Sequence, residues 1–236
     1  MRTGLYAAVS GLEQAQRRQT AIAYNLANAS TPGFKAKKVI SSSFRATLER
    51  GEPRTHYVRT NEVTDFSQGN LELTDRRLDV ALNGKGFFAV QTQQGTRYTR
   101  DGSFHVDATG QLVTKSGDPV LGEGNQPLRV ADSDGLSINE AGQIVLNGEP
   151  RGQLQIVDFD EPYPLTSMGG GLFYAEEGAR PKPSVASVTQ GALEGSNAPA
   201  IDMLVQMIEN LRAFEANQKS IQSIDRTLQR AVASSS

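Results

Sequence analysis

The stretch Ser196-Asn197-Ala198-Pro199-Ala200-Ile201 opens the segment that decides the fold, and no glycine or proline interrupts it from Ala200 to Val232. A polar cap followed by proline is typical of a helix start. Apolar residues then recur at steps of three and four, the spacing of one helix face: Ile201, Leu204, Ile208, Leu211, Phe214, Ile221, Ile224 and Leu228. The three-residue step at 211–214 is a stammer, which locally overwinds a coiled coil. At roughly 1.5 Å per residue the helix would be about 45 Å long, and its apolar stripe needs a partner from elsewhere.

A second helix is predicted at the other end of the chain, over residues 3–28. Its apolar residues fit one face: Leu5, Val9, Leu12, Ala15, Ile22 and Leu26. Gln16 and Gln19 lie close to this stripe and make it narrow and partly polar. The segment ends at Asn28-Ala29-Ser30-Thr31-Pro32-Gly33, where proline and glycine stop the helix and form a turn. Each terminal helix lacks a neighbour in sequence, so the simplest arrangement pairs them with each other and with neighbouring molecules.

The middle of the chain changes to a period of two. Phe87-Phe88-Ala89-Val90 predicts a buried strand, Asp101-Gly102 predicts a hairpin turn, and further short strands follow at Gly-rich turns. Residues 104–113 resemble residues 136–145 at an offset of 32, which suggests a duplicated hairpin. The expected organisation is an N-terminal helix (1–34), an extended connector (35–66), a central β domain (67–180), a connector (181–195) and a C-terminal helix (196–236). The predicted fold class is α+β, with the two long helices paired as a coiled-coil-like domain.

Composition is that of an ordered protein, with 37 % hydrophobic and 21 % charged residues and no cysteine. The absence of cysteine excludes disulfides and thiolate chemistry. No stretch approaches the roughly 18 apolar residues of a membrane span, and the N-terminus lacks the apolar core of a secretory signal. Residues 1–60 carry a net charge of +7 and the remainder −9. The basic residues are scattered without the spacing of a nucleic-acid motif, so we expect neither nucleic-acid binding nor membrane insertion.

Few residues suggest chemistry. His56 lies in a connector and His105 in a predicted strand, and neither has a recognised catalytic arrangement around it. Asp132-Ser133-Asp134-Gly135 begins like a calcium loop but lacks the glutamate at the twelfth position. Gly84-Lys85-Gly86 lacks the remaining residues of a phosphate-binding loop. We therefore expect no catalytic, cofactor or metal site and no enzyme. Two alternatives stay open: a secreted binding module built on the β domain, and a hydrolase, which the histidines disfavour.

Four blocks resemble the bacterial flagellar rod and hook proteins, in that family's order. They are Asn25-Leu26-Ala27-Asn28-Ala29-Ser30-Thr31-Pro32-Gly33-Phe34, then 78–90 (LDVALNGKGFFAV), then 98–113, and finally Gly195-Ser196-Asn197 with the following helix. Tyr24 departs from the family pattern, which usually has Asn there. The connector 35–66 is short, and no second large β domain is present, so the chain is more similar to proximal-rod than to distal-rod or hook members.

The resemblance implies a structural subunit that polymerises in the flagellar basal body, within the cell envelope, and transmits torque. Its terminal helices would line the inner tube, with the β domain outside. It implies export through the flagellar type III apparatus without a cleaved signal, and partners that are copies of the chain and neighbouring rod proteins. The expected assembly interface comprises the helix-stripe residues together with Asn28: Leu5, Val9, Leu12, Ile22, Leu26, Asn28, Ile201, Leu204, Ile208, Leu211, Phe214, Ile221, Ile224 and Leu228.

Overall fold

The computed structural model describes residues 2–45, 56–130 and 135–233, and the chain divides into two compact units. The helical unit comprises Met1–Ala27, Ala36–Asp65 and Ala198–Ser236, and the β unit comprises Asn28–Lys35 and Phe66–Asn197. Two terminal helices and a large central β region make the fold class α+β, as the sequence predicted. Among the described residues, neither helix combines the length and the apolar character that crossing a membrane requires.

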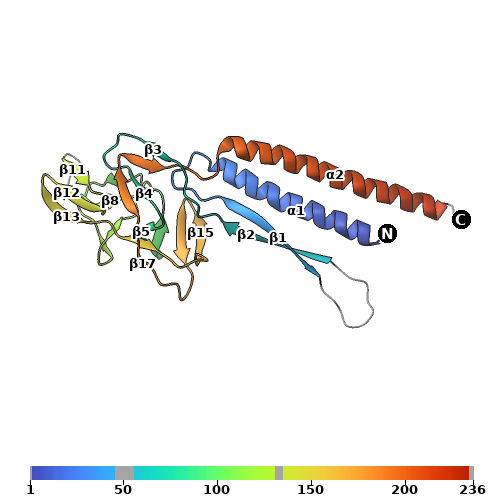
Figure 1. Cartoon of the computed structure of the whole chain (residues 1–236), viewed down its shortest axis with the longest axis horizontal. Helices are drawn as coiled ribbons and strands as arrows, with labels where there is room; N and C mark the ends of the chain where they lie inside the picture. Colours follow the sequence, from blue (N-terminus) through green and yellow to red (C-terminus); the bar gives the residue numbers. More distant parts are fainter. Residues whose placement is uncertain (1, 46–55, 131–134, 234–236) are drawn as a thin grey trace. The chain divides into compact units, whose positions relative to one another are not determined.

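The helical unit contains both helices and a β-hairpin. Helix α1 spans Arg2–Ala27 and helix α2 spans Ala200–Ala233. Strands β1 (Lys37–Arg45) and β2 (His56–Thr64) pair antiparallel, with Lys37 opposite Thr64 and Arg45 opposite His56. Within this unit α1 runs antiparallel beside α2 on one side and contacts β1 and β2 on the other (Figure 1). Residues 35–66, expected as an extended connector, thus hold a paired β-hairpin.

The β unit is built from short antiparallel strands. Its main sheet has six strands in the order β15-β16-β6-β5-β14-β17, and a three-stranded sheet has the order β11-β12-β13. The strands are β3 (Leu71–Leu73), β4 (Val80–Asn83), β5 (Phe87–Thr92), β6 (Gly95–Thr99), β7 (His105–Val106), β8 (Leu112–Val113), β9 (Leu121–Gly122), β10 (Gln126–Pro127), β11 (Leu136–Ile138), β12 (Gln143–Leu146), β13 (Glu149–Gln153), β14 (Ile156–Asp158), β15 (Leu165–Gly169), β16 (Leu172–Ala175), β17 (Lys182–Pro183), β18 (Ser187–Gln190) and β19 (Ala192–Glu194). Residues 181–195, expected as a connector, contain β17, β18 and β19.

Strand β5 divides the core of the β unit into two halves. Phe88 and Val90 project into one apolar cluster, whereas Phe87 and Ala89 project into the other. Because both faces of the strand are buried from Phe87 to Val90, these four residues are all apolar rather than alternating with polar ones. Phe87 meets Phe66 and Phe173 at ring-centroid distances of 5.7 and 6.0 Å, in the edge-to-face range that aromatic pairs favour.

The duplicated hairpin predicted from the sequence is present. In the first copy, Asp107 Oδ1 accepts hydrogen bonds from the N–H groups of Thr109 and Gln111, between β7 and β8. In the second copy, Asn139 Oδ1 accepts the equivalent bonds from Ala141 and Gln143, between β11 and β12. An oxygen acceptor at this position satisfies both turns, which explains why the first hairpin can have Asp there and the second Asn.

The prediction of a hairpin turn at Asp101-Gly102 is wrong. Strand β6 ends at Thr99, and the backbone then continues to Ser103, which forms an isolated bridge with Asp79. Gly102 is also not among the residues with positive φ, although Gly110 is, with φ 77°. Gly102 is required because a Cβ there would lie 1.7 Å from the carbonyl oxygen of Val80. Backbone proximity therefore excludes a side chain at this position.

Candidate functional site

Helix α2 carries a seam of covered side chains. Between residues 201 and 224 the only side chains that are not exposed recur at alternating steps of four and three: Met203, Met207, Asn210, Phe214, Asn217, Ile221 and Ile224. This is the 3.5-residue spacing with which one helix packs along another. Helix α1 lies along α2 within the same unit and covers this seam.

The predicted α2 stripe is split between two faces. Phe214, Ile221 and Ile224 belong to the seam, whereas Ile201, Leu204, Ile208 and Leu211 lie outside it with exposures of 77, 48, 53 and 47 %. The step at 211–214 is therefore a change of face, not a stammer in one continuous stripe. Together with Val205, which is 50 % exposed, the four residues form what we call the open stripe. The open stripe ends at Leu211, because the residue one turn further along the helix is the charged Glu215.

The predicted α1 residues are distributed over several environments. Ile22 is buried at 3 % exposure, Leu12, Leu26 and Asn28 are half-buried, and Val9 is 42 % exposed. The side chains of Leu5 and Leu228 lie outside the described residues. Asn28 sits after the end of α1, where its carbonyl accepts a hydrogen bond from the N–H of Thr31 in the turn that follows.

Asn25 was missed by the sequence reasoning. Its amide Nδ2 donates to the carbonyl of Lys37 at 2.8 Å, and its Oδ1 accepts from the Lys37 N–H at 2.8 Å. The side chain is therefore bonded to both backbone groups of one residue, and Asn25 is buried at 4 % exposure. This pair of bonds ties the last turn of α1 to the first residue of β1. A polar residue within an apolar helix segment was the available signal.

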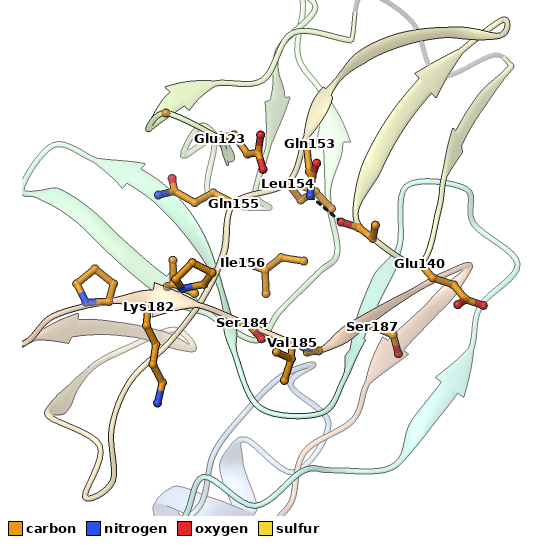
Figure 2. Close-up of a pocket in the computed structure, with 16 residues that line it drawn as sticks. Glu123, Glu140, Gln153, Leu154, Gln155, Ile156, Lys182, Ser184, Val185 and Ser187 are labelled. Carbon is orange, nitrogen blue, oxygen red and sulfur yellow. Dashed lines mark hydrogen bonds between the residues drawn. The ribbon is translucent and has the colours of Figure 1, made fainter.

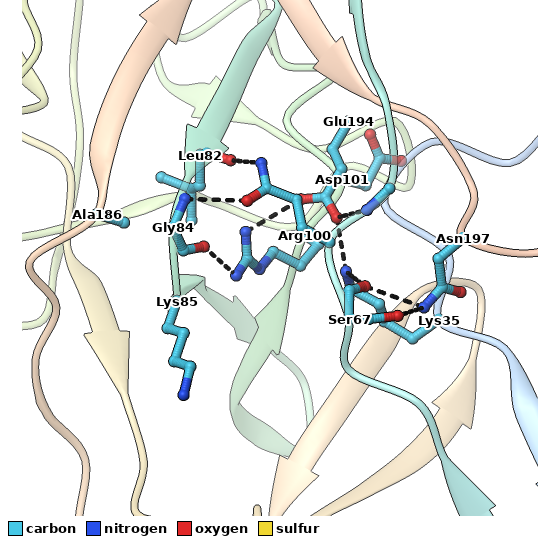
Figure 3. A network of polar contacts seen from close by, with 12 residues as sticks. Lys35, Ser67, Leu82, Gly84, Lys85, Arg100, Asp101, Ala186, Glu194 and Asn197 are labelled. Atoms are coloured by element: carbon cyan, nitrogen blue, oxygen red, sulfur yellow. Dashed lines mark hydrogen bonds and ion pairs between the residues drawn. The ribbon is translucent and has the colours of Figure 1, made fainter.

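A buried ionic cluster lies within the β unit, which the sequence did not predict (Figure 3). The carboxylate of Glu194 binds Lys35 Nζ at 2.6 Å through Oε1 and Arg100 Nη1 at 3.0 Å through Oε2. The side chains of Lys35 and Glu194 are fully buried, and that of Arg100 is 4 % exposed. Ion pairs at such burial are strongly coupled, because removal of one partner leaves an uncompensated charge.

Backbone groups complete the cluster. Lys35 Nζ also donates to the carbonyl of Ser67 at 2.7 Å, and Glu194 Oε1 accepts from the Gly69 N–H at 2.9 Å. Arg100 Nη2 donates to the carbonyl of Gly84 at 2.6 Å. Burial lowers the pKa of the Arg100 guanidinium from its ordinary value, and the Glu194 carboxylate opposes that shift.

The cluster joins the segment that follows α1 to the segment that precedes α2. Besides the Lys35–Glu194 pair, the Gly33 N–H donates to the Glu194 carbonyl at 2.6 Å and the Asn197 N–H to the Phe34 carbonyl at 3.3 Å. Gly33 has φ 66°, and a Cβ there would lie 2.3 Å from the Arg100 carbonyl carbon. Glycine is thus required both for the turn and for the close approach.

Three family profiles match separate parts of the chain. Residues 5–35 match the flagella basal body rod protein family, residues 81–146 the flagellar hook protein FlgE/F/G D1 domain, and residues 189–234 the flagellar basal body rod FlgEFG protein C-terminal domain. The chain is 36 % identical over 256 residues to the flagellar basal-body rod protein FlgG of Buchnera aphidicola subsp. Acyrthosiphon pisum, covering 96 % of this chain and 97 % of the relative. The chain belongs to the flagellar basal-body rod protein family. It is also 37 % identical to FlgF of Salmonella typhimurium over 247 residues and to FlgF of Escherichia coli over 246 residues, with 96 % of both chains covered in each case.

The ionic cluster takes one residue from each matched segment of this rod-family chain. Lys35 comes from the N-terminal match, Arg100 from the D1 match and Glu194 from the C-terminal match. The cluster is therefore the place where the separate parts of the family sequence meet in the β unit. The charged groups of the three residues bind one another and backbone groups, while the buried Arg100 Nε has no hydrogen-bond partner among the described residues.

A shallow groove of about 840 Å³ lies on the β unit of this rod-family chain (Figure 2). The residues that line it include Glu123, Glu140, Gln155, Lys182 and Ser184. Glu123 and Glu140 stand apart in Figure 2 and do not form a carboxylate pair for acid–base chemistry. Lys182 is held by Asp160 at 2.6 Å, which raises the pKa of its ammonium.

Among the described residues, those considered for chemistry are not assembled into a site. His105 is exposed in β7, and the side chain of His56 and residues 131–134, which include Asp132–Asp134, lie outside the described part of the chain. Among the described residues, no group of three or more His, Cys, Asp or Glu side chains is placed to hold a metal. The rod family is structural. The described residues present the open stripe of α2 as an exposed apolar surface.

Proposed function

We propose that the chain is a structural subunit of the bacterial flagellar basal-body rod, polymerising through its terminal helices into the shaft that transmits torque. The open stripe of α2 is the observation that carries this proposal. A stripe of five exposed apolar residues is unusual on a helix whose seam is already covered by α1. Burying it against neighbouring subunits would use the apolar surface that the folded chain leaves in water.

We propose that α1 and α2 pair as a coiled-coil-like element and that the element is the axial core of the subunit. The heptad spacing of the α2 seam supports this, because the seam runs from Met203 to Ile224 and meets α1 at Asn210 and Asn217. Between copies, the assembly interface then comprises the open stripe and Val9, with the half-buried Leu12 and Leu26 beside them and Leu5 and Leu228 at the ends. The seam residues Phe214, Ile221 and Ile224 and the buried Ile22 serve the packing of the helical unit within one chain. Asn28 contributes by shaping the turn after α1.

The subunit would act without catalysis, and its partners would be copies of itself, neighbouring rod proteins and the flagellar export apparatus. We place it in the basal body within the cell envelope, exported without a cleaved signal peptide. Among rod positions we favour the proximal one over the distal or hook positions, on the shortness of the 35–66 segment. Relatives named FlgF and FlgG match at nearly equal identity, so the position is a proposal of its own.

Leu211→Asp tests the use of the open stripe. Leu211 is 47 % exposed, so the substitution should change the free energy of unfolding of the isolated chain by no more than about 0.5 kcal/mol. In the rod the same carboxylate would be buried without a partner, which costs several kcal/mol. We therefore expect the variant to fold but to fail to restore swimming when it replaces the wild-type gene in a deletion strain.

Gln206→Asp is the matched control. It places a carboxylate on an exposed position of the same helix outside the open stripe and the seam. The control should restore swimming. If Leu211→Asp also restores swimming and is found in purified basal bodies, the open stripe is not an assembly surface.

A further inference from the structure

The seam of α2 contains two asparagines among its apolar residues. Asn210 and Asn217 are seven residues apart and occupy the same heptad position as Met203 and Ile224. Asn210 is 6 % exposed, about as buried as Met203 at 7 %. An amide at such a position lowers the stability of a helix pair and selects among possible partners.

The hydrogen-bond partners of Asn210 both lie on α1. Its Nδ2 donates to the carbonyl of Ala15 at 2.8 Å and to Oε1 of Gln19 at 2.9 Å. Ala15 is small enough for the amide to reach the α1 backbone. Gln19 is one of the two glutamines that make the α1 stripe narrow and partly polar in the sequence. The polar positions of the two helices are therefore matched to each other.

Asn217 meets α1 one heptad further along. A Cβ built on Gly11 would lie 3.0 Å from Asn217 Nδ2, so glycine leaves the space that the asparagine occupies. Along this part of the seam α1 presents Gly11, Ala15 and Gln19, which are small or polar. A purely apolar helix face would fit Asn210 and Asn217 poorly, because it would offer their amides no hydrogen-bond partners.

The open stripe of a second copy is such an apolar face. If it replaced α1 on the seam, the Asn210 amide would lose both acceptors and be buried without a partner, a costly arrangement. Conversely, leucine at position 210 would favour an apolar partner and would leave Gln19 of α1 without its donor. The amide thus favours α1 and disfavours the apolar surface that other copies carry.

We propose that Asn210, supported by Asn217, is the specificity-determining residue that reserves the seam of α2 for α1 of the same chain. Copies are then excluded from the seam and meet through exposed surfaces such as the open stripe. This inference rests on the proposed function for its role in the rod. Its test uses purified protein in solution, so its failure is distinguishable from a failure of the rod assignment, which motility and basal-body composition report.

The experiment compares Asn210→Leu with Gln206→Leu in the full-length chain by sedimentation equilibrium. Both variants add a leucine to α2, but Gln206 is exposed and outside the seam. We expect Asn210→Leu to self-associate at least about tenfold more tightly than wild type, whereas Gln206→Leu should shift association by less than about threefold. Asn210→Ala removes the amide without added bulk and should also associate more tightly. Circular dichroism at 222 nm verifies that each variant retains its helices.

A disulfide reporter identifies which helices have paired. The chain has no cysteine, so Gly11→Cys with Asn217→Cys supplies a single pair where α1 meets α2. With Asn210 present, mild oxidation should give the intramolecular disulfide. With Asn210→Leu added, the yield of the intramolecular disulfide should fall substantially, because the open stripe of another copy carries no cysteine and would displace α1 from the seam. If Asn210→Leu and Asn210→Ala are helical, associate no more than Gln206→Leu and give the intramolecular disulfide in the same yield as the protein with Asn210, then Asn210 does not select the partner and the proposal is overturned.

Discussion

Glu194→Gln is expected to destabilise the β unit strongly. The wild-type carboxylate offsets two cations, Lys35 and Arg100, whose side chains are 0 and 4 % exposed. Glutamine has nearly the same shape, but it removes the negative charge and turns an N–H₂ group toward one of the two cations. Breaking a buried ion pair by removing one partner costs about 3–5 kcal/mol.

For a unit of this size, each kcal/mol lowers the midpoint of thermal unfolding by about 2–4 °C. We therefore expect Glu194→Gln to lower the midpoint of the β unit by about 6–20 °C. Scanning calorimetry with near-ultraviolet circular dichroism measures this, since tyrosines of the β unit such as Tyr98 report its packing.

Glu149→Gln provides the matched control. Glu149 pairs with Arg151 at 3.1 Å, but the two side chains are 73 and 43 % exposed. An exposed pair contributes at most about 1 kcal/mol, so this variant should unfold within about 4 °C of wild type. If Glu194→Gln lowers the midpoint no more than Glu149→Gln does, the buried cluster does not stabilise the β unit and the reasoning is refuted.

Three further substitutions test other parts of the structure. Hydrogen bonds from the Gln111 N–H and the Thr109 hydroxyl hold the pKa of Asp107 below its ordinary value. The contribution of Asp107 to stability is therefore present above the unfolded-state pKa of about 3.9. That contribution is lost as pH falls through the folded-state pKa. Asp107→Asn, which copies Asn139 of the second hairpin, should leave the urea midpoint at pH 7 almost unchanged and flatten its fall below pH about 4; an equal fall in both proteins would contradict this. Gly102→Ala should lower the free energy of unfolding by at least about 3 kcal/mol, because its Cβ would meet the Val80 carbonyl. Gly117→Ala should lower it by only about 1–2 kcal/mol, because Gly117 has positive φ but open space around it. Equal urea midpoints for the two variants would show that proximity to Val80 is not the constraint. Asn25→Ala should leave both backbone groups of Lys37 without the partner they have here and speed amide exchange at Lys37 at least about tenfold; unchanged exchange would show that the pair of bonds is dispensable.

The sequence was most informative where local periodicity decides structure. The helix α2 and the two repeated hairpins follow from spacing and turn residues alone. The α+β class follows from the change of period between the ends and the middle. The prediction of a turn at Asp101-Gly102 was wrong because the dipeptide is a local signal, whereas Gly102 is constrained by the Val80 carbonyl, which is distant in sequence.

The candidate interface was only partly predictable. Ile201 and Ile221 fit one helical stripe by spacing, yet they lie on different faces, because Asn210 and Asn217 take seam positions that a purely apolar pattern skips. The ionic cluster was hidden for a different reason. Lys35 and Glu194 are 159 positions apart, and nothing in either neighbourhood distinguishes a buried charge from a solvated one. Such pairs depend on tertiary packing rather than on local pattern.

The most direct test of the central claim is a cryo-electron microscopy map of basal bodies isolated from the organism that encodes this chain. The account predicts that the chain can be traced in the rod, with α1 covering the Met203–Ile224 seam of the same subunit. It also predicts that Ile201, Leu204, Ile208 and Leu211 are buried against a neighbouring subunit. A map of the complete rod in which the chain is absent, or in which these four side chains face solvent, would contradict the account.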